Sequence, residues 1–157
     1  MRKALFVLIL LAPVFVFSQR TILHCGKLID VKSGTLLNEY SVIVENEKII
    51  AVERGYTKAG SADKVIDLKN KTVMPGLIDC HVHMEHETNP NQYMETFTLN
   101  PADYAFLSVV FSERTLMAGF TTVRDLGGSG VNISLRNAIN KKLIKGPRVY
   151  TAGKSIA

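Results

Sequence analysis

The chain has 157 residues, of which 46% are hydrophobic and 21% are charged, with 11 glycines and 5 prolines. This composition excludes a disordered or low-complexity chain and supplies enough apolar residues for the core of one ordinary domain. The formal net charge is +5. Because the basic residues are scattered and no aromatic residues lie between them, we expect no nucleic-acid partner.

The first 18 residues are typical of a signal peptide. Arg2 and Lys3 give a positive start, residues 4–17 are uncharged and apolar, and Ser18 follows. The apolar run is shorter than the roughly 20 residues that cross a bilayer as a helix. We therefore predict a signal peptide over 1–18, a periplasmic or secreted location, and no stable membrane span in the mature protein. A retained membrane anchor is the alternative.

Residues 19–75 indicate an all-β segment, because short β-branched runs alternate with polar turns. Asn46 is expected in a hairpin turn, since asparagine tolerates the left-handed conformation, and residues 69–71 are expected to form a second turn. The predicted strands lie at 21–23, 27–31, 41–44, 48–52, 65–68 and 72–74.

The chain has two cysteines, Cys25 and Cys80. Two are too few for a fold that disulfides hold together, even in an exported protein. We expect Cys80 to be a small buried thiol within a strand, and a single bridge between the two is the alternative.

The pattern changes after Pro75 and Gly76 to alternating strands and helices, which indicates a parallel sheet built from right-handed crossovers. Asn100 is expected to cap a helix that ends at Gly119. A strand at 120–124, a glycine-rich turn, a helix at about 133–143 and a strand at 148–151 are predicted to follow.

The candidate chemistry lies in residues 77–83, Leu-Ile-Asp-Cys-His-Val-His. Alternate side chains of a strand share a face, so Asp79, His81 and His83 are expected to point the same way. Two imidazoles at this spacing reach a single ion at the roughly 2.0–2.1 Å of zinc–nitrogen bonds. We predict His81 and His83 as metal ligands, with a pair of core histidines as the alternative. The opposite face is expected to be dry and carries Ile78, Cys80 and Val82.

Other polar residues give weaker signals. Asp79 lies deeper than the two histidines and is expected to orient a ligand or to fill the interior beneath the site, rather than to bind the ion. His86 could reach the site, although a solvated loop residue is the favoured interpretation. For Asp125, contact with substrate and a structural role in its turn both stay open. Residues 127–130 lack the lysine of a P-loop and are expected to form a connection, and His24 is expected to be an ordinary strand residue.

The string Met-Pro-Gly-Leu-Ile-Asp-Cys-His-Val-His at 74–83 resembles the opening of the metal-dependent amidohydrolase superfamily. Residues 114–128 resemble the first barrel helix and second strand of these enzymes, and 146–153 resemble the third strand. Within the superfamily, the chain is most similar to the imidazolonepropionase-like and Xaa-Pro dipeptidase-like subgroup.

This resemblance implies an α/β fold in which residues 19–75 form the N-terminal part of a composite β-sandwich. Residues 76–157 would then be the first three strands of a (β/α)8 TIM barrel that is incomplete in this sequence. One or two divalent ions, expected to be zinc, would bind His81 and His83 at the carboxyl end of the first barrel strand. The remaining ligands and the aspartate that acts as general base are expected beyond Ala157, so no catalytic residue is assigned.

The reaction that the resemblance implies is metal-assisted hydrolysis of an amide-like carbon–nitrogen bond in a small molecule or dipeptide. Hydrolysis of a cyclic amide or imidazolone ring is the second choice. Since the sequence holds two of the three protein ligands that a catalytic zinc site needs, we expect the 157-residue fragment itself to be inactive. A noncatalytic secreted β-rich binding module, or a degenerate remnant, is the alternative. Assembly as a homo-oligomer is left open.

Overall fold

The computed structural model describes residues 19–155. It divides the chain into two compact units, one ending at Pro75 and the other beginning at Gly76. The predicted signal peptide lies outside the described residues. Among the helices of the described part, none is both long and apolar enough to cross a membrane.

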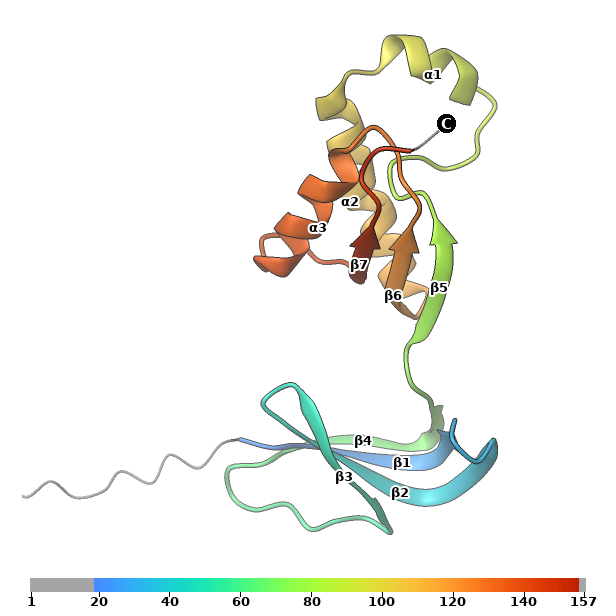
Figure 1. Cartoon of the computed structure of the whole chain (residues 1–157). Coiled ribbons are helices and arrows are strands. Elements are labelled where there is room, and N and C mark those ends of the chain that lie inside the picture. Colours follow the sequence, from blue (N-terminus) through green and yellow to red (C-terminus); the bar gives the residue numbers. More distant parts are fainter. Residues whose placement is uncertain (1–18, 156–157) are drawn as a thin grey trace, which may run out of the picture. The chain divides into compact units, whose positions relative to one another are not determined.

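The first unit is a four-stranded sheet in the order β3-β2-β1-β4 (Figure 1). Its strands are β1 (Thr21–Asp30), β2 (Thr35–Glu45), β3 (Lys48–Arg54) and β4 (Lys64–Val73). β1 pairs antiparallel with β2 and parallel with β4, and β2 pairs antiparallel with β3. Cys25, Leu28 and Val42 form the buried core of this sheet. The predicted all-β segment is therefore confirmed, with longer strands than expected.

The hairpin between β2 and β3 turns at the predicted asparagine. Asn46 and Glu47 have φ angles of 49° and 63°. Positive φ at both central residues is the requirement of the two-residue turn whose twist matches the flanking strands. The expectation for Asn46 is confirmed.

The second predicted turn, at 69–71, is wrong, because β4 runs through it. The pairing with β1 shifts register there: Cys25 is opposite Leu68, whereas Lys27 is opposite Thr72. The extra residues of β4 form a bulge over Gly26. A Cβ atom on Gly26 would lie 1.9 Å from the carbonyl oxygen of Lys69, so this close approach requires glycine.

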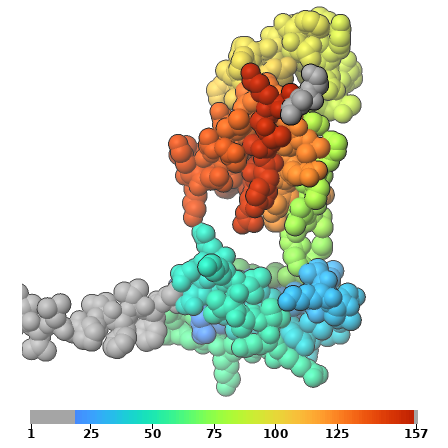
Figure 2. All heavy atoms as spheres, viewed as in Figure 1, coloured from blue at the N-terminus to red at the C-terminus, as the bar shows by residue number. Residues whose placement is uncertain are grey.

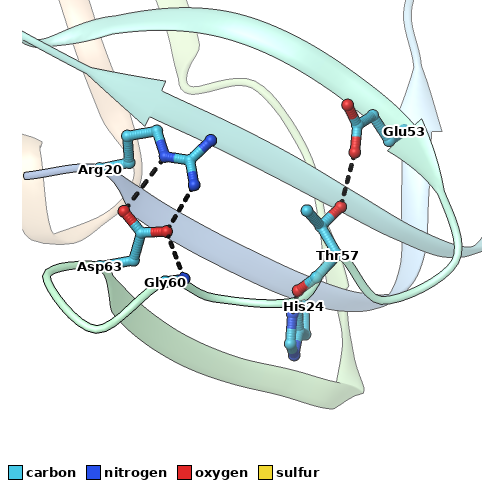
Figure 3. A network of polar contacts seen from close by, with 6 residues as sticks. All are labelled: Arg20, His24, Glu53, Thr57, Gly60 and Asp63. Carbon is cyan, nitrogen blue, oxygen red and sulfur yellow. Dashed lines mark hydrogen bonds and ion pairs between the residues drawn. The ribbon is translucent and has the colours of Figure 1, made fainter.

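Polar contacts fasten the connection between β3 and β4 to the sheet (Figure 3). Arg20 donates hydrogen bonds of 3.1 and 2.6 Å to the Asp63 carboxylate, and the Gly60 N–H donates a third of 2.8 Å. The Arg20 hydrogen bond, followed by that of Gly60, lowers the pKa of Asp63 to about 2. On the same connection, the Thr57 carbonyl oxygen lies 3.0 Å from Nε2 of His24, a strand residue as expected.

The second unit is a parallel sheet in the order β5-β6-β7 (Figure 1). Its strands are β5 (Leu77–Val82), β6 (Phe120–Asp125) and β7 (Arg148–Thr151), and its helices are α1 (Gln92–Thr98), α2 (Pro101–Met117) and α3 (Val131–Asn140). The alternation of strands and helices is as predicted, although the sequence analysis did not predict α1. In Figure 1, α1 lies beyond the arrowheads, at the carboxyl end of the strands.

Helix α2 begins and ends as predicted. The Asn100 side chain accepts hydrogen bonds from the backbone of Ala102 and Asp103, and the Asp103 carboxylate accepts one from the Asn100 N–H. This reciprocal capping box satisfies N–H groups that the first turn leaves without partners. Gly119 follows the helix with a φ of 97°.

The core of the second unit lies between the helices and β6 and β7. Met84, Val123, Leu135 and Val149 are its buried members. The helices pack mainly on β6 and β7: α2 contacts β6, and α3 contacts β7. This placement explains why Cys80, which was expected to be buried, is exposed. Both cysteines are free thiols.

Candidate active site

His81 and His83 lie next to each other at the carboxyl end of β5. Their ring centroids are 5.6 Å apart and the rings meet at 69°. Both residues are exposed, so both imidazoles are open to a ligand. Carboxyl ends of strands are where parallel α/β barrels carry their chemistry.

The strand that carries them is less regular than the sequence analysis assumed. Asp79 is opposite Val123 whereas Val82 is opposite Asp125, so three steps on β5 match two on β6. This irregularity interrupts the strict alternation of faces. Val82 packs against the core, but Ile78 is 65% exposed, so the expectation of a dry opposite face is wrong for Ile78.

The Asp79 side chain forms a hydrogen bond with the backbone of its own strand. Its Oδ1 accepts a hydrogen bond of 2.9 Å from the backbone N–H of His81. The carboxylate thus holds the backbone of one histidine. The expected role of Asp79 in orienting a ligand stays a prediction.

The ring of His83 is fixed by a backbone carbonyl. Its Nδ1 lies 2.7 Å from the carbonyl oxygen of Gly127, in the loop after β6. A carbonyl oxygen only accepts hydrogen bonds, so Nδ1 must carry the proton and donate it. In the neutral ring, Nε2 then keeps the lone pair with which histidine binds metals.

Two further aromatic side chains extend this row of rings. The ring of His86 stacks on that of His83 at 6.2 Å and 16°. Tyr104 of α2 meets His86 edge-on at 6.3 Å. His86 is half-buried, and it reaches the candidate site rather than being a solvated loop residue.

A hollow of about 510 Å³ opens beside these rings. It lies at the end of the unit where Figure 2 shows the yellow-green α1 segment beside the red last residues. His83 and His86 line it together with Gln92, Tyr104 and Ser129. The sequence analysis missed Gln92 and Tyr104, because neither belongs to a motif and only the folded chain brings their helices over the strand end.

Glu85 is a buried carboxylate that the sequence analysis also missed. It is 2% exposed and accepts backbone hydrogen bonds of 2.8 Å from Ser129 and 3.0 Å from Asn132, at the start of α3. Burial raises its pKa, but the hydrogen bonds from Ser129, Asn132 and Gly130 outweigh burial, so the pKa falls below its usual range. Glu85 is therefore charged at neutral pH and caps α3 from a distant part of the chain.

The described residues fit part of a zinc site. Imidazole nitrogen is a preferred zinc ligand, and the Nε2 of His83 keeps its lone pair. Among residues 19–155, no three histidine, cysteine or carboxylate side chains gather closely enough to hold an ion by themselves. The chain thus presents two neighbouring ligands of the right chemistry.

Comparison with known proteins places the chain in a family. Residues 72–157 match the model of the amidohydrolase family. The chain is 29% identical to the ochratoxinase of Aspergillus niger over 145 residues, which cover 87% of this chain and 28% of that protein. It is 38% identical to the imidazolonepropionase of Photorhabdus laumondii over 73 residues, 46% of this chain and 17% of that protein.

A solved Xaa-Pro dipeptidase with methionine bound in its active site is also similar. It superposes with a TM-score of 0.82 at 38% identity, covering 88% of this chain and 34% of the dipeptidase. This agreement confirms the α/β fold. The chain spans about a third of the length of these relatives or less. Because the family model matches more than half of the chain, the chain belongs to the amidohydrolase family.

Proposed function

We propose that the protein containing this chain is a divalent-metal-dependent hydrolase of carbon–nitrogen bonds in small substrates, with Xaa-Pro dipeptides the first class to test. The observation that carries the proposal is the adjacent pair His81 and His83 at the end of β5, with Nε2 of His83 kept unprotonated. Similarity to an Xaa-Pro dipeptidase across 88% of the chain supports the choice of substrate.

We infer that the four-stranded sheet is part of a composite β-sandwich and that β5, β6 and β7 are the first three strands of a TIM barrel. The parallel order, the intervening helices and the position of the histidines at the strand ends support this inference. Both outer strands of the three-stranded sheet have an unpaired edge within the described chain, as a barrel segment would.

The roles of this chain's residues follow from their contacts. His81 and His83 would hold the ion through ring nitrogens, and Asp79 would steady the backbone of His81. A bound divalent ion lowers the pKa of a water ligand toward about 7 and polarises a carbonyl group. Gln92 and Tyr104 line the hollow, where they would contact and position the substrate.

The size of the hollow agrees with a small substrate. Its volume of about 510 Å³ falls within the roughly 300–1,000 Å³ of small-molecule sites. Relatives named as an ochratoxinase and an imidazolonepropionase show why other amides, including cyclic ones, belong in the same screen.

The test uses the natural gene product that contains this chain, stripped with a chelator and reloaded with zinc, manganese, cobalt or nickel. We expect a metal-dependent hydrolysis of Xaa-Pro dipeptides that H81A and H83A abolish. H24A is the matched control, because His24 belongs to the first unit and bonds Thr57 there. Hydrolysis that survives both site variants, or none with any metal and amide tested, would overturn the proposal in favour of a noncatalytic module.

We also propose that residues 1–18 direct export and are removed. Mass spectrometry of the protein recovered outside the cytoplasm should give a mature N-terminus near residue 19. An intact Met1 on a cytoplasmic protein would contradict this prediction.

A further inference from the structure

A buried carboxylate, Asp125, lies at the end of β6 next to the candidate site. It is fully buried and accepts three hydrogen bonds. Its Oδ2 accepts one of 2.9 Å from the Met84 N–H, and its Oδ1 accepts one of 2.8 Å from the Gly127 N–H and one of 2.9 Å from the Asn132 side-chain amide. No solvent-facing part of this side chain is left to meet a substrate.

Two of these three donors flank His83. Met84 is the next residue in the chain, and Gly127 is the residue whose carbonyl oxygen accepts the proton of His83 Nδ1. The contacts therefore form a closed ring. Met84, the residue after His83, and Gly127 both donate to Asp125, and Gly127 in turn accepts from the His83 imidazole. Because one carboxylate accepts from both the Met84 and the Gly127 N–H, it holds the backbone at both points where His83 is attached to these contacts.

The loop that contains Gly127 has a second, separate anchor. Glu85 accepts hydrogen bonds from the Ser129 and Asn132 backbone, and a Cβ atom on Gly128 would lie 2.6 Å from the Glu85 carboxyl carbon. Loss of the Asp125 carboxylate would thus release Gly127 while Glu85 still holds the start of α3. Loss of the Asp125 carboxylate should therefore change the proton position on His83 while the loop stays folded.

We propose that Asp125 is the positioning residue of His83: through Gly127 and Met84 it sets which ring nitrogen carries the proton and keeps Nε2 free as a ligand. The importance of this role for catalysis rests on the proposed function. The assignment of the ring proton does not, because it concerns the chain without metal.

The first readout is the ¹⁵N spectrum of histidines in the metal-free natural gene product that contains this chain. At about pH 8, above the ordinary histidine pKa of about 6.5, the His83 signals, identified by their loss in H83A, should show a proton on Nδ1. D125A should move the proton partly or wholly to Nε2. D79A is the matched control, because Asp79 bonds the backbone of His81 and should leave His83 unchanged.

The second readout is zinc affinity. We expect D125A to lower it by about 10–100-fold, as loss of groups that orient metal ligands does.

If D125A fails to fold, D125N replaces it. The amide oxygen of D125N still accepts from Gly127, whereas the contact with Met84 is lost. We therefore expect D125N to change the His83 signals less than a complete loss of the carboxylate would. If the proton stays on Nδ1 of His83 in the variant that folds, the proposal is overturned. A natural gene product that binds no zinc, but in which D125A still moves the His83 proton, would overturn the proposed function and support the positioning role.

Discussion

Arg20 and Asp63 tie the residue before β1 to the residue before β4 through two hydrogen bonds, the shorter of which is 2.6 Å. The Asp63 side chain is 6% exposed, whereas that of Arg20 is 37% exposed. The contact joins the starts of two parallel strands. It also holds the pKa of Asp63 at about 2, below the roughly 3.9 of an unfolded aspartate.

This lowered pKa predicts an acid-sensitive first unit. Because the folded pKa lies below the unfolded one, the stabilisation is fully present above about pH 4 and is lost as the pH falls through about 2. The melting temperature of the wild type should therefore drop more steeply than that of D63N between about pH 4 and pH 2. D67N is the matched control, since the Asp67 carboxylate bonds the nearby Lys69 N–H. Parallel curves for wild type and D63N would refute the prediction.

The sequence analysis predicted correctly those features that depend on residues close to them in the chain. The hairpin at Asn46 follows from one residue that tolerates positive φ, and α2 follows from Asn100, Pro101 and Gly119 at its ends. The histidine pair follows from the strand spacing of His81 and His83. In each case every signal lies within a few positions of the turn, helix end or strand end that it determines.

The failures share the opposite cause, a partner that is distant in the sequence. Residues 69–71 look like a turn until Gly26 lies opposite them. Helix α3 begins at Val131 rather than 133, because the Glu85 carboxylate accepts from its first N–H groups. Cys80 is exposed because the helices pack mainly on β6 and β7. The aromatic and polar lining of the hollow likewise depends on where α1 and α2 fold back.

The capping box of α2 gives a stability prediction. N100A removes the side-chain acceptor for the Ala102 and Asp103 N–H groups and should lower the free energy of unfolding by about 1 kcal/mol. N91A is the matched control, because Asn91 caps α1 without a side-chain hydrogen bond and should cost far less. Urea unfolding followed by circular dichroism measures both. Equal losses for the two variants would contradict the assigned role of Asn100.

The bulge over Gly26 gives a second stability prediction. G26A places a methyl group against the Lys69 carbonyl and should destabilise the first unit by more than about 2 kcal/mol, since backbone must move. G60A is the control: its Cβ would be 3.5 Å from the nearest atom, an Asp63 carboxylate oxygen, which is ordinary contact. Thermal unfolding that leaves G26A within about 0.5 kcal/mol of G60A would show that the two strands separate at this point without cost.

Substitution of His86 should affect substrate binding but not metal binding. Its ring stacks on His83 and meets Tyr104 at the wall of the hollow, whereas the paired ligands are His81 and His83. H86A should therefore leave zinc affinity nearly unchanged in a calorimetric titration. In the natural gene product it should raise the KM for a dipeptide by about 3–10-fold, the size of one lost hydrogen bond. H24A again serves as the control. If H86A instead abolished zinc binding with the fold intact, His86 would have to be counted as a third metal ligand, and the ion would lie deeper in the hollow than the strand-end pair alone implies.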